Sequence, residues 1–249
     1  MTGRFDLTGK RALITGAARG IGAGAARALA EAGAAVMLTD ILGDRLLETA
    51  ASIPGATSHP ADITDEAAVD ALVAHHCAQL GGLDILVCSA GIAVPQTIDQ
   101  TSLETWNRVL QVNLTGTFLA CRAAVAAMRT QGHGGRIILL GSVVGHQGAL
   151  LGHVAYAATK GGVHAFAKAL ARSTAADRIT VNVVAPGLTD TEMLRGAHPP
   201  EEIAEISSRI PLGLAQADDV AAAVVYLASD AARQITGAVL DINGGMLMR

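Results

Sequence analysis

Short runs of apolar residues alternate along the chain with longer stretches in which apolar residues recur every three or four positions. The short runs predict buried strands, and they cover residues 11–15, 35–39, 57–61 (the weakest), 85–88, 136–140, 180–184 and 238–242. The longer stretches predict helices at 66–80, 103–129, 155–175 and 218–229. Between the first two strands, Ile21, Ala25, Ala28, Leu29 and Ala32 form one apolar helical stripe.

Seven strands alternating with helices favour βαβ units and a mainly parallel sheet. Right-handed connections between such units give a doubly wound, Rossmann-type α/β fold with helices on both faces. No linker or internal repeat divides the sequence, so we expect a single domain over 1–249. The segment 189–211 breaks the alternation with Pro199-Pro200. It is either a surface excursion or a lid over the substrate, and its place after a strand favours the lid.

Composition and charge exclude several classes of function. The net charge is −4 and no lysine or arginine run stands out, so we expect no nucleic-acid partner. The first ten residues lack an apolar signal region, and no uninterrupted apolar stretch is long enough to span a membrane. Cys77, Cys88 and Cys121 are odd in number and widely spaced, which predicts free thiols and a cytoplasmic location. The pair His75-His76 lacks partners at ligand spacing, so we expect no metal.

A glycine-rich turn follows the first strand, in the order Thr15-Gly16-Ala17-Ala18-Arg19-Gly20-Ile21-Gly22. Glycines permit a tight turn and let the backbone approach a pyrophosphate, while the following helix offers free N–H groups and its positive dipole end. The position of the turn between the first strand and first helix predicts a dinucleotide site at Gly16, Arg19, Gly20, Ile21 and Gly22.

Asp40 ends the second predicted strand, where a carboxylate binds ribose hydroxyls and repels a 2′-phosphate. It therefore favours NAD (NADH) over NADP, although Arg19 would favour the phosphate and Asp40 has the alternative role of a helix N-cap. Asp62-Ile63 follows the third strand and is a candidate adenine contact, or a plain turn.

Tyr156 and Lys160 are four residues apart in a helical pattern, so they share one helix face. A lysine cation beside a phenol favours the phenolate and lowers its pKa, which would allow acid–base chemistry; a structural pair is the alternative. Ser142 follows the fifth strand, where its hydroxyl can bond a substrate oxygen. Asn113 lies inside a long helical pattern, and a kink there would free a carbonyl for water.

These motifs together resemble the short-chain dehydrogenase/reductase family, in its branch of about 250 residues, over essentially the whole chain. The shared motifs are the glycine turn, Asn113, Ser142, Tyr156-x-x-x-Lys160, Pro186-Gly187 with Thr191, and Asn243-Gly244-Gly245. The resemblance implies that Tyr156 is the acid and base and that Ser142 orients the substrate oxygen. It implies that Lys160 binds the nicotinamide ribose and lowers the Tyr156 pKa, and that the Asn113 main chain holds a relay water.

The resemblance further implies that Pro186, Gly187 and Thr191 border the nicotinamide. It also implies a homotetramer formed through the predicted helices 103–129 and 155–175. Two positions depart from the family pattern. Cys88-Ser89-Ala90-Gly91 replaces the usual Asn-Asn-Ala-Gly, which leaves Ser89, Ala90 and Gly91 as main-chain contacts, and Thr189 stands where Ile or Val is frequent beside the carboxamide.

The residues expected near the substrate are mostly apolar, with two imidazoles: Val144, His146, His153, Leu188, Met193 and Leu194. His153 precedes Tyr156 by three residues, so it faces either the cleft or solvent. No basic cluster suggests a phosphorylated or carrier-bound substrate, which favours a small neutral secondary alcohol or ketone, with a polyol or sugar as one option. The alternatives are an NADPH-dependent 3-oxoacyl reductase and a non-catalytic NAD-binding sensor or scaffold.

Overall fold

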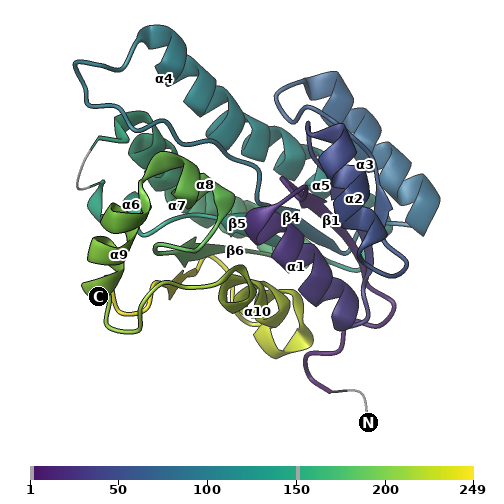
Figure 1. The fold of residues 1–249 in the computed structure, drawn as a ribbon. Helices are drawn as coiled ribbons and strands as arrows, with labels where there is room; N and C mark the ends of the chain where they lie inside the picture. Colours follow the sequence, from purple (N-terminus) through teal and green to yellow (C-terminus); the bar gives the residue numbers. More distant parts are fainter. Residues whose placement is uncertain (1–2, 150–151) are drawn as a thin grey trace.

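The computed structural model describes residues 3–149 and 152–249, which form a seven-stranded sheet covered by helices (Figure 1). The strands are β1 (Arg11–Thr15), β2 (Ala35–Thr39), β3 (Thr57–Ser58), β4 (Ile85–Cys88), β5 (Gly135–Leu140), β6 (Ile179–Pro186) and β7 (Val239–Ile242). Their order is β3-β2-β1-β4-β5-β6-β7, and each neighbouring pair is parallel. The predicted doubly wound fold is confirmed. The strand order reverses between β1 and β4, where such folds bind ligands.

Strand bounds differ most from the prediction at the third and sixth strands. The third strand covers only Thr57–Ser58 rather than 57–61, although the His59 and Ala61 amides still donate to the Leu38 and Asp40 carbonyls. The sixth strand extends from Ile179 to Pro186, and Pro186 pairs with Ile242 of β7. This extension carries the chain to the carboxyl edge of the sheet, at which Gly187 follows.

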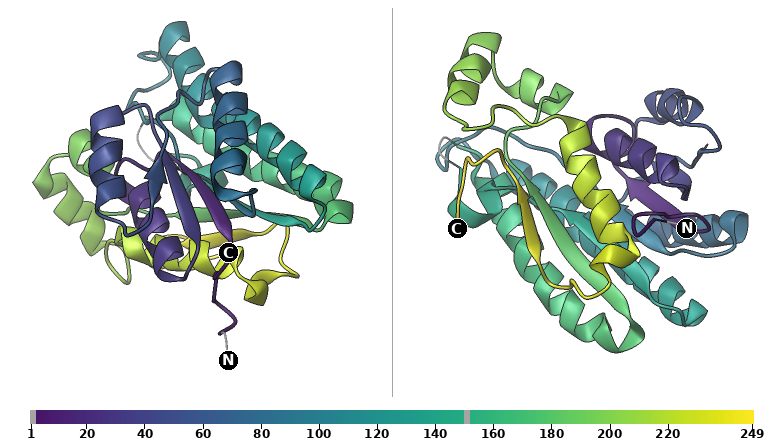
Figure 2. Two further views of the ribbon diagram at one scale, coloured as in Figure 1. Left: turned by 90° about the vertical axis from the view of Figure 1, so that its right-hand side faces the viewer. Right: turned by 90° about the horizontal axis from the view of Figure 1, so that it is seen from below.

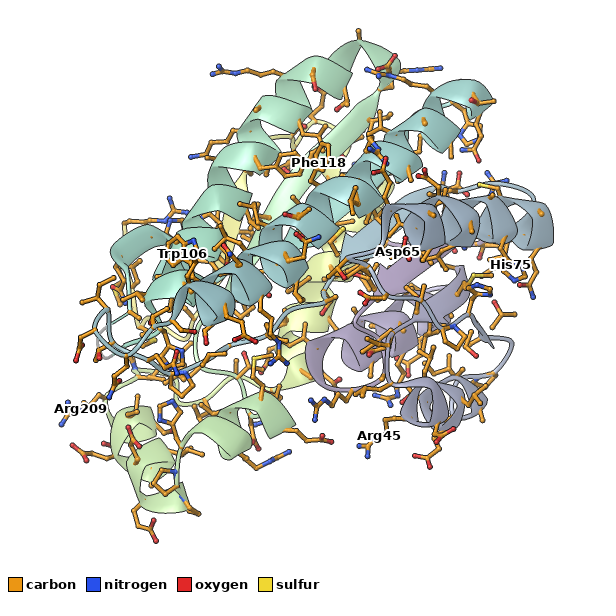
Figure 3. All side chains as sticks on the ribbon, turned by 90° about the horizontal axis from the view of Figure 1, so that it is seen from above. Arg45, Asp65, His75, Trp106, Phe118 and Arg209 are labelled. Carbon is orange, nitrogen blue, oxygen red and sulfur yellow. The ribbon has the colours of Figure 1, made fainter. Side chains whose placement is uncertain are left out.

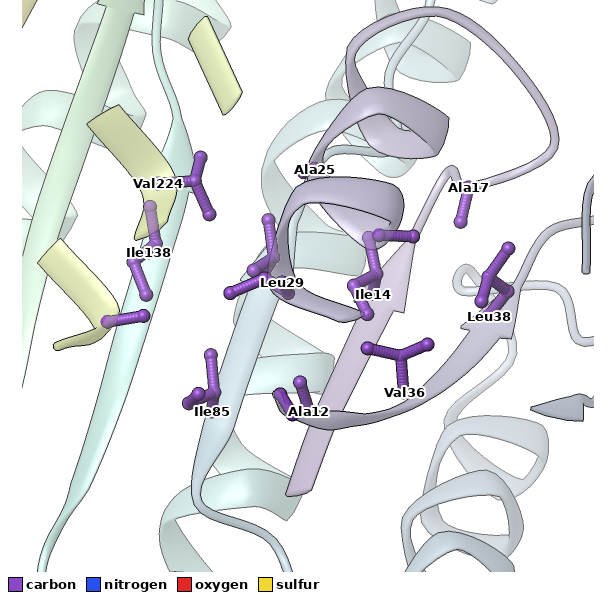
Figure 4. Close-up of a cluster of buried hydrophobic side chains, with 14 of the residues drawn as sticks. Ala12, Ile14, Ala17, Ala25, Leu29, Val36, Leu38, Ile85, Ile138 and Val224 are labelled. Atoms are coloured by element: carbon purple, nitrogen blue, oxygen red, sulfur yellow. The ribbon is translucent and has the colours of Figure 1, made fainter. Parts of the chain in front are cut away.

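Helices cover the sheet in two layers. α1 (Gly20–Glu31), α2 (Gly43–Ala51) and α10 (Ala217–Ala228) pack on one face, and α3 (Glu66–Leu80), α5 (Gly116–Gln131) and α7 (Val154–Thr174) pack on the other. Figure 4 shows the first core, in which Leu29 of α1 and Val224 of α10 meet Ile14 and Ile138 of the sheet. Small residues such as Ala25 let these helices lie close to the strands, which suits a chain with 2% aromatics.

The long predicted helix at 103–129 is divided in the structure. α4 (Leu103–Leu110) runs into a π-helical turn, η1 (Gln111–Thr115), and then into α5. Asn113 lies in the π turn, so the predicted distortion there is confirmed. By length and composition, Leu103–Gln131 is the one run in the described part of the chain that could cross a membrane, and 56% of its most apolar window is buried inside the protein.

The segment 189–211 forms two short helices, α8 (Glu192–Ala197) and α9 (Pro200–Ser208). Thr191 caps α8 by accepting a hydrogen bond from the Leu194 amide, and Pro200 occupies the first helical position of α9. Figure 2 shows the pair standing apart from the two helix layers. The segment is therefore ordered secondary structure, and its inner side chains reach the cavity described below.

Two buried histidines predict that the protein loses stability in mild acid. His76 and His164 are 0% and 5% exposed, and burial lowers the pKa of each to about 4. Unfolding frees each imidazole to bind a proton at about 6.5, so stability is complete above pH 6.5 and falls as the pH drops towards 4. At pH 5 each histidine should cost about 2 kcal/mol.

Urea unfolding at pH 7 and pH 5 measures this loss. His76→Leu should reduce the pH dependence by the share of one histidine. A pH dependence that is identical in wild type and His76→Leu would contradict the explanation.

Candidate active site

The glycine turn after β1 packs tightly against neighbouring backbone and leaves the start of α1 open. Gly16 has a φ of +66°, and a Cβ there would lie 2.5 Å from the Ala90 backbone. A Cβ on Gly22 would lie 2.1 Å from the Gly16 carbonyl oxygen. Arg19 is the N-cap of α1 and forms no side-chain cap, so the first-turn N–H groups of α1 stay open to an anion. The turn fits a dinucleotide pyrophosphate.

Replacing Gly22 by alanine should therefore weaken NADH binding. The added methyl pushes the Gly16 carbonyl out of place, and overpacking of this kind raises the dissociation constant by about 10- to 100-fold. Fluorescence titration with NADH measures the effect. Gly43→Ala is the matched control because the nearest atom to its Cβ is 4.0 Å away. Equal NADH affinity in the two variants would contradict the assignment of the turn.

Asp40 lies at the carboxyl end of β2 with its carboxylate fixed by two main-chain bonds. Oδ2 accepts from the Ala18 amide and Oδ1 from the Leu42 amide, both at 3.1 Å. The N-cap of α2 is Leu42, with no side-chain cap, so Asp40 is not the N-cap of that helix. The carboxylate instead lines the cavity and ties the glycine turn to β2.

Arg19 does not point at Asp40 but pairs with the lid. Its guanidinium lies 2.7 Å from Glu192 of α8, and Arg45 of α2 lies 2.7 Å from the other oxygen of the same carboxylate. The hydrogen bond from Arg19, together with the charges of Arg45 and Arg19, keeps the pKa of Glu192 below its usual range. Arg45, labelled in Figure 3, is exposed on the surface beside this end of the cavity. Arg19 could attract a 2′-phosphate, but Glu192 already neutralises part of its positive charge.

The adenine end of the cavity is walled by Asp62-Ile63 and by Ser89, Ala90 and Gly91. Asp62 also shapes its own turn, because Oδ1 accepts from the Thr64 amide and hydroxyl, each at 2.8 Å. Asp62 is therefore a turn residue that also lines the cavity, and its contact with adenine stays a prediction.

Ser142, Tyr156 and Lys160 meet at the carboxyl end of β5. Lys160 Nζ lies 5.5 Å from the centre of the Tyr156 ring and donates to the Leu140 carbonyl at 2.6 Å. The hydroxyl of Ser142 accepts from the Val144 amide at 3.2 Å. All three side chains line one cavity. The predicted catalytic set is therefore brought together by α7 and the β5 edge.

The pKa of the phenol differs from the expectation. Burial raises the pKa of Tyr156 above its ordinary value, and a hydrogen bond with Ser142 only partly opposes that shift. Burial also lowers the pKa of Lys160 to about 8, which weakens it as a cation. The expected lowering of the Tyr156 pKa by Lys160 is not seen, because burial dominates the shift and the hydrogen bond with Ser142 is the one opposing influence. The phenol is protonated at neutral pH, as an acid should be.

Asn113 is buried behind the cavity rather than on its wall. Its Oδ1 accepts from the Ile92 amide at 2.8 Å, and its Nδ2 donates to the Ile92 carbonyl and to the Thr159 hydroxyl. A Cβ on Gly91 would lie 3.3 Å from Asn113 Oδ1 and 3.9 Å from Lys160 Nζ. The Asn113 carbonyl accepts from the Thr117 hydroxyl at 2.8 Å. Asn113 thus fixes the loop after β4 next to Lys160.

The loop after β6 closes the other side of the cavity. Pro186, Gly187, Leu188, Thr189 and Thr191 all line it. Gly187 packs so tightly on Asn243 that a Cβ would lie 2.9 Å from the Asn243 Cα. The Pro186-Gly187 motif and the C-terminal motif that begins at Asn243 therefore pack against each other.

The cavity has a volume of about 1050 Å³, which is enough for a dinucleotide together with a small substrate. It brings together the predicted cofactor residues with Val144, His153, Leu188, Met193 and Leu194. His153 lines this cavity and is partly exposed, so it faces both the cleft and solvent. His146 does not line the cavity: its Nε2 lies 3.0 Å from Asp241 and its ring packs at a tilt on His164, so the prediction of a substrate contact there was wrong. The short helix α6 (Val144–Gln147) turns Val144 inward and His146 away.

Several lining residues were not predicted. Those from the lid and the C-terminus are Glu192, His198, Glu202, Ile206, Arg209, Ile210 and Met246. The apolar spacing of Ile203, Ile206 and Ile210 was visible in the sequence, but it did not indicate which face of α9 lies over the cavity. Figure 3 shows Arg209 at the edge of this lid.

Comparison with known proteins agrees with the arrangement. A family model described as enoyl-(acyl carrier protein) reductase matches residues 16–247. The 3-oxoacyl-(acyl-carrier-protein) reductase of Escherichia coli K12 is 41% identical over 98% of this chain and 100% of its own length. The D-threitol dehydrogenase of Mycolicibacterium smegmatis is 39% identical over 98% of this chain and 95% of its own. A crystal structure of a short-chain type dehydrogenase/reductase from Mycobacterium marinum superposes with a TM-score of 0.94, at 37% identity and 98% coverage of both chains.

Proposed function

Because the chain belongs to the short-chain dehydrogenase/reductase family, we propose that it is an NAD(H)-dependent oxidoreductase that interconverts a secondary alcohol and a ketone. The observation that carries the proposal is the meeting of Ser142, Tyr156 and Lys160 in the same cavity as the glycine turn and Asp40. An intact acid–base set of this kind argues against a sensor or scaffold that binds NAD without catalysis.

Each catalytic side chain has a separate task in the proposed reaction. Ser142 donates a hydrogen bond to the substrate oxygen and steadies its developing negative charge. Tyr156 gives its proton to that oxygen when a ketone is reduced, and takes the hydroxyl proton when an alcohol is oxidised. Lys160 would hold the nicotinamide ribose and restore the proton of Tyr156. A nicotinamide bound there would serve as hydride donor in reduction and as hydride acceptor in oxidation.

The direction of the Tyr156 pKa shift has a consequence for this reaction. A raised pKa keeps the phenol protonated, which suits ketone reduction at neutral pH. Oxidation needs the phenolate, and the positive charge of an oxidised nicotinamide, if Lys160 holds it near Tyr156, would lower the pKa of the phenol. Alcohol oxidation should therefore speed up with rising pH, whereas ketone reduction should not.

NAD is the cofactor we propose, and NADP is less favoured. Asp40 is held in place by two main-chain bonds and cannot turn away from a 2′-phosphate without losing them. Arg19 is engaged by Glu192. The carboxylate therefore opposes the phosphate more strongly than Arg19 attracts it.

A second candidate is an NADPH-dependent 3-oxoacyl reductase, supported by the 41% identity to the E. coli 3-oxoacyl reductase. Arg108 lies at the cavity with no ion-pair partner among the described residues, so it is the group an anionic acyl carrier would use. The 39% identity to a D-threitol dehydrogenase supports the proposed alcohol dehydrogenase instead. Asp40 decides our preference between the two.

A panel of wild-type assays distinguishes these candidates. Absorbance at the NADH band follows oxidation of butan-2-ol, butane-2,3-diol, threitol and cyclohexanol with NAD or NADP, and reduction of a 3-oxobutyryl thioester with NADH or NADPH. We expect the highest kcat/KM with an alcohol and NAD. A kcat/KM that is highest for the thioester with NADPH would favour the second candidate.

The cavity lining also suggests how the substrate is enclosed. We infer that 189–211 acts as a lid, because Met193 of α8, Ile206 of α9 and Ile210, which follows α9, line the cavity. We place the protein in the cytoplasm, without nucleic-acid or membrane partners. Its three cysteines are free thiols, as a reducing compartment requires.

Assembly into a homotetramer is a further part of the proposal. Side chains of α5 and α7 line a shallow groove of about 310 Å³ on the outer helix layer, and Phe118 is 44% exposed there with its ring edge on Phe166. Figure 3 shows Phe118 on the outside of the molecule. An exposed aromatic pair on two long neighbouring helices suits packing against a second copy.

Replacing Phe118 by glutamate should therefore break the tetramer. A charge buried in an apolar helix contact costs several kcal/mol. Sedimentation velocity should show four 25.2 kDa chains together in wild type and smaller species in the variant. Leu47→Glu, at a 57% exposed position on α2, is the control and should leave the assembly intact. A monomeric wild type, or an unchanged Phe118→Glu, would contradict the proposed interface.

A further inference from the structure

His153 holds an unusual backbone conformation directly before the catalytic helix. It is the N-cap of α7, with φ 59° and ψ 28°, in the left-handed region. In the described part of the chain only Arg178 shares this conformation among residues other than glycine. Such strain persists where the surroundings hold it, and it is typical of sites that place a side chain for function. The result here is an imidazole on the cavity wall.

The imidazole is placed between the catalytic tyrosine and the lid. Its ring centre lies 6.3 Å from that of Tyr156, in an edge-on arrangement, and also 6.3 Å from that of His198. His198 follows α8, and its Nδ1 lies 3.1 Å from Glu202 of α9. A substrate oxygen bound at Tyr156 therefore has His153 as a polar neighbour on the side of the cavity that the lid covers.

The ring of His153 offers hydrogen bonds that the protein does not use. Within 3–149 and 152–249, neither of its nitrogens has a hydrogen-bond partner, although the residue is half-buried. Burial and the nearby His198 lower its pKa, so the ring is neutral at pH 7. A neutral imidazole has one donor and one acceptor, as a hydroxyl group does. Arg209 of the lid already pairs with Glu205, so it is not free to hold an anion beside His153.

We propose that His153 binds a second hydroxyl of the substrate, next to the carbinol that reacts at Tyr156. The preferred substrates are then vicinal diols, polyols or the matching hydroxyketones, rather than alcohols with a single oxygen. This inference rests on the proposed alcohol dehydrogenase function. A site built to hydrogen-bond a substrate hydroxyl rejects the analogue that lacks it, because its own polar group is left unpaired.

Matched substrate pairs test the inference: butane-2,3-diol against butan-2-ol, and cyclohexane-1,2-diol against cyclohexanol, each with NAD. Wild type should prefer the diol of each pair by about tenfold or more in kcat/KM. His153→Phe keeps an aromatic ring but no hydrogen-bonding atoms, and should remove that preference by lowering only the diol value. His153→Gln restores a donor and an acceptor and should recover most of it.

Two further measurements keep the test decisive. His153→Asn suits the left-handed backbone but is too short to reach the substrate, so it should behave as His153→Phe does even if the phenylalanine variant folds poorly. NADH affinity should be unchanged in all three variants. Equal losses for diols and simple alcohols, or a wild type that oxidises both equally, would overturn the inference alone. A wild type that oxidises none of the four alcohols would instead overturn the proposed function, and this inference with it.

Discussion

Replacing Tyr156 by phenylalanine is expected to lower kcat for alcohol oxidation and ketone reduction by about a thousandfold. Tyr156 supplies the one phenol among the described residues that line the cavity, beside Ser142 and Lys160, so the variant loses the group that we propose carries the proton. The hydrogen-bonding part of the site, which includes Ser142, remains in the variant. Binding of NADH should therefore be nearly unchanged while turnover is lost.

Tyr226 provides the matched control, because it is the second of the two tyrosines in the chain. It lies in α10, on the opposite face of the sheet from α7, and its ring packs on Phe5. Tyr226→Phe should retain wild-type kcat. A Tyr156→Phe enzyme that keeps more than a tenth of the wild-type kcat would show that another group moves the proton.

Replacing Asp40 by asparagine is expected to change the ratio of kcat/KM for NAD and NADP by about a hundredfold in favour of NADP. A unit charge a few ångströms from a phosphate is worth about 3 kcal/mol at an effective dielectric constant near 20. Asparagine removes the charge but keeps one acceptor oxygen for the Ala18 or Leu42 amide, so the glycine turn should keep its shape.

Asp44→Asn is the control for this substitution, because Asp44 is an acidic residue of the first turn of α2 that does not line the cavity. It should leave the cofactor ratio unchanged. If wild type already uses NADP as well as NAD, or if Asp40→Asn leaves the ratio where it was, Asp40 does not select the cofactor. That result would favour the NADPH-dependent 3-oxoacyl reductase over the alcohol dehydrogenase.

The fold and the cofactor half of the site could be predicted because both depend on short-range patterns. Apolar runs such as 85–88 have to be buried on both faces, and the glycines of 16–22 are needed where the backbone itself is the binding surface. The helix i, i+4 spacing likewise places Tyr156 and Lys160 on one face whatever surrounds them.

The predictions that failed concern properties that depend on the three-dimensional surroundings of a residue. Spacing shows that Lys160 is near Tyr156, but not that both are desolvated, and desolvation sets the direction of their pKa shifts. His146 and Val144 are two residues apart, and the turn of α6 decides which one faces the cavity. The lid side chains depend on how α9 docks, which its apolar spacing does not specify.

The substrate half of the cavity is where the sequence is least informative and the structure adds most. His198, which pairs with Glu202, meets His153 only because the lid folds back over the start of α7. No local pattern links positions 153 and 198. The position of His153 between His198 and Tyr156 is the basis of the proposal that the substrate carries a second hydroxyl.

Transfer of deuterium from a labelled alcohol is the most direct test of the central claim that Tyr156 and Lys160 support hydride transfer to NAD in this cavity. Wild type would be incubated with NAD and butane-2,3-diol deuterated at its carbinol carbons, and the reduced cofactor analysed by mass spectrometry. We expect one deuterium in each NADH formed by wild type, and no labelled NADH above background with Tyr156→Phe. Label released to water, or equal labelling by both enzymes, would contradict the account.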